Sequence, residues 1–444
     1  MYSETLRKLL HMAVVGLAFL LRFLTPSQAM LMAASAVVMN LFILPRVVGR
    51  WVFRPDEAQG TVAGGIVLYP IAVLITIACL PHRLDLVAGA WGILAVGDGM
   101  ATLVGRAIGR HSPHWPWNPR KSVAGTLAFA VAGAAASIVL IRWSAPAVAA
   151  PPGLAFAAWA SVAAAVVAGL VESIDLRIDD NLSVTFSAAA TLWCASLIDA
   201  GSVSASWPLV AQRIVPALVV NAIVAAAVMR ARQVDAGGAL AGAVVGLALA
   251  LGAGAAGWLM LLAAFVAAAA CSKFGERSKR SHGIAEEREG RRGAGNALAN
   301  CGVAAIGAIM AATTPHTPLA LLIVVVGLTA GASDTVASEV GKAMRGTTFS
   351  VRSLSRVPPG TPGAMSVAGT VAGAVRAAVL AACGAWLGLI TTSQIGLVVV
   401  ASTAGALVES LLAANFEERG YLTNDLLNFL NTTAAAAIAV ALSR

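Results

Sequence analysis

Residues 97–109 of the chain read GDGMATLVGRAIG, and residues 120–126 read RKSVAGT. Asp98 stands between two glycines near the end of an apolar segment, and Lys121 belongs to a short cationic loop with Ser and Thr. Mg²⁺ is usually held by one or two carboxylates together with substrate phosphates, and a lysine places a point charge on such phosphates. The two stretches therefore predict a phosphate and Mg²⁺ site at a membrane surface.

The same stretches have a purely structural interpretation. Ala101, Gly105 and Gly109 recur at every fourth residue and share one helical face, which is typical of closely packed membrane helices. Lys121 is equally consistent with a cation that anchors a helix end at the membrane surface. Both interpretations stay open when this region is considered alone.

Four motifs of the first half recur in the second half in the same order. The pairs are Asp98-x-x-Ala101-x-x-x-Gly105 with Asp334-x-x-Ala337-x-x-x-Gly341, Ser122-Val-Ala-Gly-Thr126 with Ser366-Val-Ala-Gly-Thr370, Val171-Glu172-Ser173 with Val408-Glu409-Ser410, and Asn181-Leu182 with the region of Asn424. Each second copy follows its first by about 240 residues, which is the spacing of an internal repeat. Each match is weak in an Ala- and Gly-rich chain, but four in one order predict an internal duplication.

The composition is that of a polytopic membrane protein. Hydrophobic residues make up 59% of the 444 residues and charged residues 11%. Apolar runs of sufficient length predict about 15 transmembrane helices, near 7–24, 29–45, 62–80, 84–107, 122–141, 153–172, 182–200, 207–229, 237–253, 255–271, 294–312, 317–341, 363–389, 394–411 and 425–443. The expected fold is all-α, with two parallel seven-helix repeats (1–205 and 233–444) joined by one helix (206–232).

The charge distribution supports this topology. With a cytoplasmic N-terminus, most of the 30 Lys and Arg residues fall on the cytoplasmic side, as the positive-inside rule requires. The motifs lie on that same side, so a multi-pass membrane protein with cytoplasmic active sites is expected. The net charge of +9 then reflects topology and does not indicate nucleic-acid binding. The five cysteines are scattered, which predicts reduced thiols without disulfides or zinc.

Further ionisable side chains lie at the ends of predicted spans in the first half. They are Arg7, Lys8 and His11 on one side of the first span, Glu172 at the end of another, and Asp179 and Asp180 in the loop that follows it. An Asp at the centre of a membrane helix costs about 2.5–3.5 kcal/mol. The carboxylates suit Mg²⁺ ligands or a base that activates a hydroxyl nucleophile. The structural alternatives are a solvated interfacial loop and, for Arg7 and Lys8, simple anchoring.

Taken together, the first-half residues resemble the dolichol kinase and phytol kinase family over residues 1–200. The matching positions are Glu4, Arg7-Lys8, His11, Asp98-x-x-Ala101-x-x-x-Gly105-x-x-x-Gly109, Lys121-Ser122-x-x-Gly125-Thr126, Glu172 and Asp179-Asp180-Asn181. The resemblance implies a membrane enzyme that phosphorylates a long-chain isoprenoid alcohol with CTP. Ala124 departs from the dolichol kinases, which usually have Glu at this place.

The second half resembles the phytyl-phosphate kinases and related uncharacterised transmembrane proteins over residues 230–440. The matching positions are Gly237-Gly238-Ala239, Lys273, Lys279, Arg291-Arg292-Gly293, Asn296, Ala299-Asn300, Asp334-Thr335-x-Ala337-Ser338-Glu339-x-Gly341, Arg356-Val357-Pro358-Pro359-Gly360-Thr361, Gly363-Ala364-x-Ser366 and Glu409-Ser410-Leu411-Leu412. Glu409 stands where that family usually has Asp, and Ala413 where it has Gly. The resemblance implies a kinase that adds a second phosphoryl group.

Elementary electrostatics agrees with two successive kinase steps. An alcohol is a neutral nucleophile and benefits from a base, whereas a phosphate monoester already carries about −1.5 to −2 charges. The second step therefore needs more positive charge, and the large polar loops of the second half supply it, with Arg291, Arg292 and Arg356 as the favoured phosphate ligands. A solvated basic loop is the structural alternative, particularly for Lys279, whose neighbours include glutamates.

The resulting hypothesis is a bifunctional isoprenoid salvage kinase. It would convert an alcohol of the phytol or geranylgeraniol type to its monophosphate and then its diphosphate, with CTP as donor and Mg²⁺ as cofactor. The predicted catalytic residues are Asp98, Lys121, Glu172, Asp180, Asp334, Glu339 and Glu409, and the predicted metal ligands are Asp98, Glu172, Asp179, Asp334, Glu339 and Glu409. The predicted nucleotide and phosphate ligands are Arg7, Lys8, Gly105, Gly109, Ser122, Gly125, Thr126, Arg291, Arg292, Asn300, Arg356, Ser366 and Thr370.

Two other functions are compatible with the sequence. A CTP-dependent lipid-phosphate cytidylyltransferase would use similar Mg²⁺ and nucleotide sites but would release a CDP-lipid, so the product mass separates the two. A repeat-containing transporter also has intramembrane carboxylates. Carriers of that kind hold them near the membrane midplane, whereas the motifs here cluster at one side. The sequence makes no prediction of oligomeric state.

Overall fold

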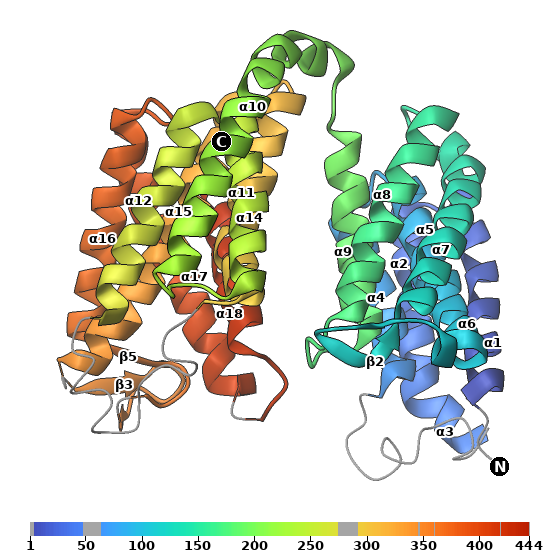
Figure 1. Cartoon of the computed structure of the whole chain (residues 1–444). Helices are drawn as coiled ribbons and strands as arrows, with labels where there is room; N and C mark the ends of the chain where they lie inside the picture. Colours follow the sequence, from blue (N-terminus) through green and yellow to red (C-terminus); the bar gives the residue numbers. More distant parts are fainter. Residues whose placement is uncertain are drawn as a thin grey trace. The chain divides into compact units, whose positions relative to one another are not determined.

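The computed structural model describes residues 4–47, 64–273, 292–344, 347–358, 360–417 and 419–443. Helices dominate these residues, as the apolar runs predict, and two small sheets contain the strands. The chain divides into two compact units, Met1–Leu197 and Ile198–Arg444. Figure 1 shows that each unit is a bundle of long helices.

The first unit contains the helices that carry the motifs of the first half. Its elements are α1 (Glu4–Ala13), η1 (Val14–Arg22), α2 (Pro26–Val38), η2 (Met39–Ile43), α3 (Leu44–Val47), α4 (Gly65–Cys79), α5 (Leu84–Gly92), η4 (Ile93–Gly97), α6 (Asp98–Ile108), η5 (Gly109–His111), β1 (His114–Trp115), β2 (Asn118–Ser122), α7 (Val123–Ser144), η6 (Ala145–Ala147), α8 (Leu154–Ser173) and α9 (Asp180–Ser196). Polar side chains start several of these helices, because they accept hydrogen bonds from free backbone N–H groups. Ser122 does so at α7, where its side chain accepts from Gly125 N.

The second unit begins with the long helix α10 and also has short strands between its helices. Its elements are α10 (Ala200–Arg230), α11 (Ala236–Gly252), α12 (Gly254–Lys273), α14 (Ala294–Thr313), α15 (Thr317–Ala343), β3 (Thr348–Ser350), β4 (Arg356–Val357), β5 (Ala364–Ser366), α16 (Val367–Trp386), η8 (Thr392–Gln394), α17 (Ile395–Leu412), η9 (Ala413–Glu417) and α18 (Asn424–Leu442). The strands form an antiparallel sheet in the order β4-β3-β5.

Eleven helices of the described residues are long and apolar enough to cross a membrane. Helices α4 and α11 are apolar but shorter, with 15 and 17 residues. The all-α prediction is confirmed, while the count of about 15 spans and the parallel arrangement of two repeats remain predictions. One predicted range needs adjustment, since 363–389 begins too early because Ala364–Ser366 is strand β5. The predicted connecting helix 206–232 overlaps α10.

Helix packing is alike in the two units for their last five helical segments. In the first unit, α7 packs on α6 and α8, α8 packs on α9, and α9 packs on α4. In the second unit, α16 packs on α15 and α17, α17 on α18, and α18 on α14. The first two helices of each framework pack differently. In the first unit, the first helix of the pair, α1, packs on α6 and the second, α2, packs on α4. In the second unit, the first helix, α11, packs on α14 and the second, α12, packs on α15. The two opening helices are thus exchanged.

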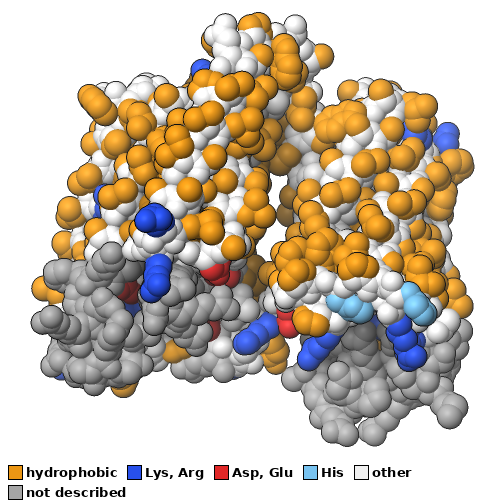
Figure 2. Space-filling model, viewed as in Figure 1, with side chains coloured by type: hydrophobic (Ala, Val, Ile, Leu, Met, Phe, Trp, Pro, Cys, Tyr) orange, Lys and Arg blue, Asp and Glu red, His pale blue; other side chains and the backbone are white. Residues whose placement is uncertain are grey.

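The outer surface of each unit suits a lipid environment. Figure 2 shows hydrophobic side chains along the sides of both units, while most visible charged side chains gather near one end of the helices. Large apolar side chains such as Val131 on α7 and Val375 on α16 are exposed. Large exposed apolar surfaces mark membrane or protein contacts, and helices satisfy their own backbone groups in lipid.

Candidate active site

Asp98 lies inside the first unit, within the long helical span Leu84–His111. The segment Ile93–Gly97, directly before it, is π-helical, and such turns are frequent at functional sites. Asp98 is 5% exposed. Lys8 Nζ donates to Asp98 Oδ2 at 2.5 Å, and His11 Nε2 lies 3.5 Å from the same oxygen. Helix α1 therefore places two ionisable side chains on this carboxylate, and the predicted phosphate ligand Arg7 is half-buried on the same helix.

The glycines on either side of Asp98 allow neighbouring helices to approach. A Cβ at Gly99 would lie 2.3 Å from Met12 Cγ. Helix α1 can therefore approach Asp98 closely because Gly99 has no side chain. A Cβ at Gly97 would lie 3.2 Å from the ring of Phe129 on α7. Both glycines therefore position the helices that surround the carboxylate.

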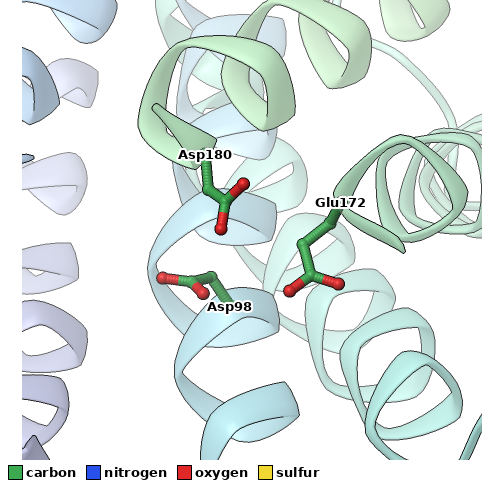
Figure 3. A group of neighbouring side chains, drawn as sticks. All are labelled: Asp98, Glu172 and Asp180. Carbon is green, nitrogen blue, oxygen red and sulfur yellow. The ribbon is translucent and has the colours of Figure 1, made fainter. Parts of the chain in front are cut away.

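Glu172 and Asp180 meet Asp98 from two other helices, α8 and α9, and the three side chains point toward one another (Figure 3). One oxygen atom of each carboxylate lies within 4.8 Å of the corresponding atoms of the other two. Glu172 is 5% exposed, whereas the side chain of Asp180 is 48% exposed, so the group is buried on one side and open on the other. Three converging carboxylates are a donor set for a hard divalent cation such as Mg²⁺.

Lys121 joins two of these carboxylates at the open side of the group. Its Nζ donates to Glu172 Oε1 and lies 3.5 Å from Asp180 Oδ2. Burial lowers the pKa of the Lys121 ammonium, but the carboxylates of Asp180 and Glu172 together raise that pKa above its ordinary value. Lys121 therefore stays charged at neutral pH, and its side chain is 31% exposed.

A short hairpin of strands β1 and β2 holds Lys121 in place. The rings of Trp115 and Trp117 stack at 4.5 Å, Trp115 Nε1 donates to Thr126 Oγ1 at 2.9 Å, and Trp117 Nε1 donates to Ser173 Oγ at 3.1 Å. The sequence analysis missed both tryptophans. The Trp-Pro-Trp run at 115–117, immediately before the cationic loop, is the signal that identifies them.

The neighbouring carboxylate Asp179 has a different position. It is the N-cap of α9, where its side chain accepts from Asn181 N at 2.9 Å and from Asn181 Nδ2 at 2.6 Å. Asn181 Nδ2 also donates to Gly65 O at 3.2 Å, which ties α9 to the start of α4. The geometry therefore places Asp180, and not Asp179, in the carboxylate group with Asp98 and Glu172.

The predicted phosphate ligands at the α6–α7 contact have packing and capping partners. A Cβ at Gly105 or Gly109 would lie 3.6 or 3.1 Å from Ser122 Oγ. Ser122 Oγ accepts from Gly125 N at 3.2 Å, and Thr126 Oγ1 donates to Ser122 O at 3.4 Å. These residues fix the start of α7 beside the carboxylates, and their contact with phosphate stays a prediction.

The second unit also has two neighbouring carboxylates, and both residues are half-buried. Asp334 on α15 and Glu409 on α17 lie close enough to repel each other electrostatically, and Asn431 of α18 lies next to Glu409. Glu409 Oε2 and both amide atoms of Asn431 are buried and make no hydrogen bond of ordinary geometry with any described residue. Such unpaired buried atoms are rare and call for a bound ion or water. Oxygen donors of this kind suit Mg²⁺.

The remaining carboxylates of this unit are placed differently. Glu339 is 2% exposed, and Lys342 Nζ lies 3.7 Å from Glu339 Oε1. Asp425, in the first turn of α18, faces the start of α14, since a Cβ at Gly295 would lie 2.1 Å from Asp425 Oδ2. Asp425 is the second residue of α18, whereas Asp180 is the first residue of α9, and Asp425 was not among the predicted site residues.

The repeated Ser-Val-Ala-Gly-Thr motif makes the same contacts as in the first unit. Ser366 Oγ accepts from Gly369 N at 3.0 Å, and Thr370 Oγ1 donates to Ser366 O at 3.0 Å. A Cβ at Gly341 would lie 2.9 Å from Ser366 Oγ. The motif therefore places α16 against α15, as its counterpart places α7 against α6.

The predicted phosphate ligands of the second unit are spread over several elements. Arg292 is half-buried beside the start of α11, where its backbone bridges to Val234. Asn300 is buried on α14, and Arg356 is exposed on β4. Arg291 lies outside the described residues.

Comparison with known proteins places the chain in a family. The sequence profile described as "Integral membrane protein DUF92" matches residues 219–436. The "Uncharacterized membrane protein sll0875" of Synechocystis sp. is 37% identical over 188 residues, which cover 41% of this chain and 72% of that protein. The chain belongs to the DUF92 family of integral membrane proteins.

Two plant proteins are also similar to this DUF92 member. "Protein VTE6, chloroplastic" of Arabidopsis thaliana is 34% identical over 194 residues, or 42% of this chain and 58% of VTE6. "Probable phytol kinase 2, chloroplastic" of Oryza sativa is 41% identical over 95 residues, or 20% of this chain and 30% of the kinase. The matches thus span little more than half of VTE6 and less than a third of the kinase. No solved structure matches the chain.

Proposed function

We propose that this protein is a bifunctional membrane kinase that converts an isoprenoid alcohol to its monophosphate in the first unit and to its diphosphate in the second. The similarity to a probable phytol kinase and to VTE6 supports a kinase-type transferase that acts on an isoprenoid. The observation that carries the proposal is the convergence of Asp98, Glu172 and Asp180 with Lys121 beside them. A charge-dense site of this kind is what phosphoryl transfer requires.

In the first step, the oxygen of the alcohol attacks the γ-phosphorus of CTP. The new bond joins that oxygen to phosphorus, the bond from phosphorus to the β,γ-bridging oxygen breaks, and CDP leaves. Asp180, the most exposed of the three carboxylates, is the candidate base for the alcohol proton. Asp98 and Glu172 would hold Mg²⁺, which supplies charge neutralisation on the phosphates. Lys121 then turns from the carboxylates to the CTP phosphates.

In the second step, an oxygen of the lipid monophosphate attacks the γ-phosphorus of a second CTP, and CDP leaves again. No base is needed, because the nucleophile is already anionic at neutral pH. Asp334 and Glu409 would hold Mg²⁺, and the unpaired Glu409 oxygen supports this assignment. Arg292, Lys342 and Arg356 are the described cations proposed to hold the two anionic substrates near each other.

The proposed location of both sites is the cytoplasmic side of a bilayer. The apolar tail of the substrate can then remain in lipid, where each CH₂ group is worth about 0.8 kcal/mol, while the head group reaches the charged end of the helices. Lys and Arg side chains are visible near this end of the helices in Figure 2.

The test is mass spectrometry of lipid products after incubation of the purified full chain with geranylgeraniol or phytol, CTP and Mg²⁺. Wild type should form the diphosphate. Asp334→Asn should accumulate the monophosphate, because only the second site has lost a ligand. Asp98→Asn should form no product from the alcohol but should still convert added monophosphate. Each substitution should slow its own step by at least about 100-fold.

Asp199→Asn is the matched control, since Asp199 is an exposed N-cap of α10 and Asn caps helices equally well. It should leave both steps unchanged. A CDP-lipid product would replace the kinase proposal by the cytidylyltransferase alternative. No phosphorylated lipid from either alcohol or from the added monophosphate would overturn the proposal.

A further inference from the structure

The second unit contains a cavity of about 130 Å³ between helices α10, α11, α12, α14 and α15. One end of its lining is polar and the rest is almost entirely apolar. A mostly apolar cavity with a few polar groups at one end is the usual form of a site for an amphiphilic ligand. The cavity is separate from the carboxylate group, but it adjoins that group through α15.

The polar end is formed by Arg292, Asn296, Asn300 and Thr335. Thr335 directly follows Asp334 on α15, so this end opens beside the proposed second active site. Asn300 is 9% exposed, and its Oδ1 has no hydrogen-bond partner among the described residues. One charged and several uncharged polar groups therefore gather where a phosphate head group would reach the reacting site.

The apolar part of the cavity runs between α10 and α12. Its walls include Val224 and Val228 of α10 and Leu261 and Phe265 of α12, all of them only half-buried. These two helices contribute apolar side chains at the outer surface of the unit, so a hydrocarbon chain can enter from lipid. Transfer of a chain from lipid into this cavity exposes no apolar surface to water.

A hydrogen-bonded pair closes the far end. Asn221 Oδ1 accepts from Trp258 Nε1 at 3.2 Å, and Asn221 Nδ2 donates to Ala217 O at 2.7 Å. A Cβ at Gly246 would lie 2.1 Å from Asn221 Oδ1, so α11 meets α10 closely there. Along α11, Gly238 at the polar end and Gly246 at the closed end are eight residues apart, which corresponds to about 12 Å of helix.

We propose that this cavity binds the hydrocarbon tail of a single-chain prenyl monophosphate, with the phosphate at Arg292 and the tail directed toward Asn221 and Trp258. The inference rests on the proposed function and names the tail site of its second step. The closed end then limits how much of the tail the protein encloses, so the cavity discriminates between tails by length. A five-carbon tail occupies only the part near the head group, whereas a twenty-carbon tail is longer than the cavity and fills its whole length.

Gly242 provides the test, because it lines the cavity midway along α11 and a Cβ there would meet no atom within 4 Å. Gly242→Leu places a side chain at the middle of the cavity, and its Cβ contacts no other atom within 4 Å. Gly302→Leu is the matched control, since Gly302 lies on α14, a Cβ there also meets no atom within 4 Å, and the residue does not line the cavity.

The measured quantity is the ratio of kcat/KM for geranylgeranyl monophosphate to kcat/KM for dimethylallyl monophosphate, with CTP and Mg²⁺. Gly242→Leu should lower this ratio at least tenfold, and Gly302→Leu should keep the wild-type ratio. Equal ratios in the two variants would overturn the tail site.

A binding experiment separates this inference from the kinase proposal. Geranyl monophosphate with a diazirine at the tail end, irradiated without nucleotide, should label α10 and α12 near Trp258, and Gly242→Leu should abolish this labelling. Labelling without any phosphoryl transfer would refute the kinase proposal and retain the tail site. Phosphoryl transfer with labels elsewhere would refute the tail site and retain the kinase.

Discussion

The two carboxylate groups of this protein differ in how their charge is balanced. In the first unit, Lys8 and His11 reach Asp98 from helix α1, and Lys121 joins Glu172 and Asp180. In the second unit, Glu409 and Asn431 retain unpaired buried atoms, and the described cation that acts on Asp334 is Lys342, near the end of α15. Asp98 thus faces two ionisable side chains of a neighbouring helix, whereas the described cation that acts on Asp334 belongs to the same helix as Asp334.

The exchanged opening helices explain this difference. The helix that packs on α15 is α12, whose residues 254–271 contain no charged side chain. The helix that packs on α6 is α1, which contains Arg7, Lys8 and His11. The two units thus share a similar packing of five helices. The opening helix beside the aspartate-bearing helix is cationic in the first unit and apolar in the second. This agrees with the proposed order of substrates, because a phosphorylated lipid brings its own charge and needs loop cations around it.

The largest expected effect on stability comes from removal of Lys8. Lys8→Met leaves Asp98 as a buried charge without its main partner, which costs about 3–5 kcal/mol. The free energy of unfolding of the full chain in detergent is the measurement. Lys342→Met in the second unit should cost only about 1 kcal/mol or less, because Lys342 is 30% exposed.

The control for Lys8 is the double variant Lys8→Met with Asp98→Asn. It removes both charges and should recover most of the lost stability. Equal losses in Lys8→Met and Lys342→Met would show that the two units balance charge in the same way.

Removal of Lys121 should affect activity more than stability. Lys121→Met should slow monophosphate formation by about 10²–10³-fold, which corresponds to about 2.7–4 kcal/mol. Conversion of added monophosphate to diphosphate should proceed at the wild-type rate and serves as the internal control. A loss of both steps would indicate that Lys121 serves the fold as a whole.

Asn431 sharpens the comparison, because its counterpart in α9, counted from the N-caps Thr423 and Asp179, is the half-buried Ser187. Asn431→Leu removes unpaired polar atoms, so the free energy of unfolding should be unchanged or rise by about 1 kcal/mol. Diphosphate formation should nevertheless fall, while monophosphate formation stays unchanged. A marked loss of stability would show that Asn431 is a structural residue.

The smallest effect is expected at the β1–β2 hairpin. Trp117→Phe and Ser173→Ala each remove the same hydrogen bond, worth about 1 kcal/mol. Each should slow the first step a few-fold through a less well-positioned Lys121, and leave the second step unchanged. The double variant should be no worse than either single variant, and additive losses in a double-mutant cycle would contradict a shared role.

Much of the fold follows from local sequence. Long apolar runs must become helices in lipid because no water is present to satisfy backbone groups, and Ser122 and Ser366 mark the starts of α7 and α16 in both motifs. The strands around Lys121 and Arg356 were not predicted. They are two to five residues long and are held by contacts such as that of Trp117 with Ser173, which lie far apart in sequence.

The candidate site was predicted in part. Asp98, Glu172 and Asp180 were all named, because carboxylates at the ends of apolar segments are costly without a function. The choice between Asp179 and Asp180 was not available from sequence, since the two are adjacent and only the start of α9 turns one into the helix cap and the other toward Asp98.

The sequence by itself determined the helical membrane architecture, the repeated motifs and the residue types of both sites, because hydrophobicity and charge act locally along the chain. Only the tertiary structure decided that Lys8 pairs with Asp98, that the opening helices are exchanged and that a mostly apolar cavity adjoins Thr335. These features depend on which helices pack together. Packing is set by side-chain shape across many distant positions, which no single segment of the sequence encodes.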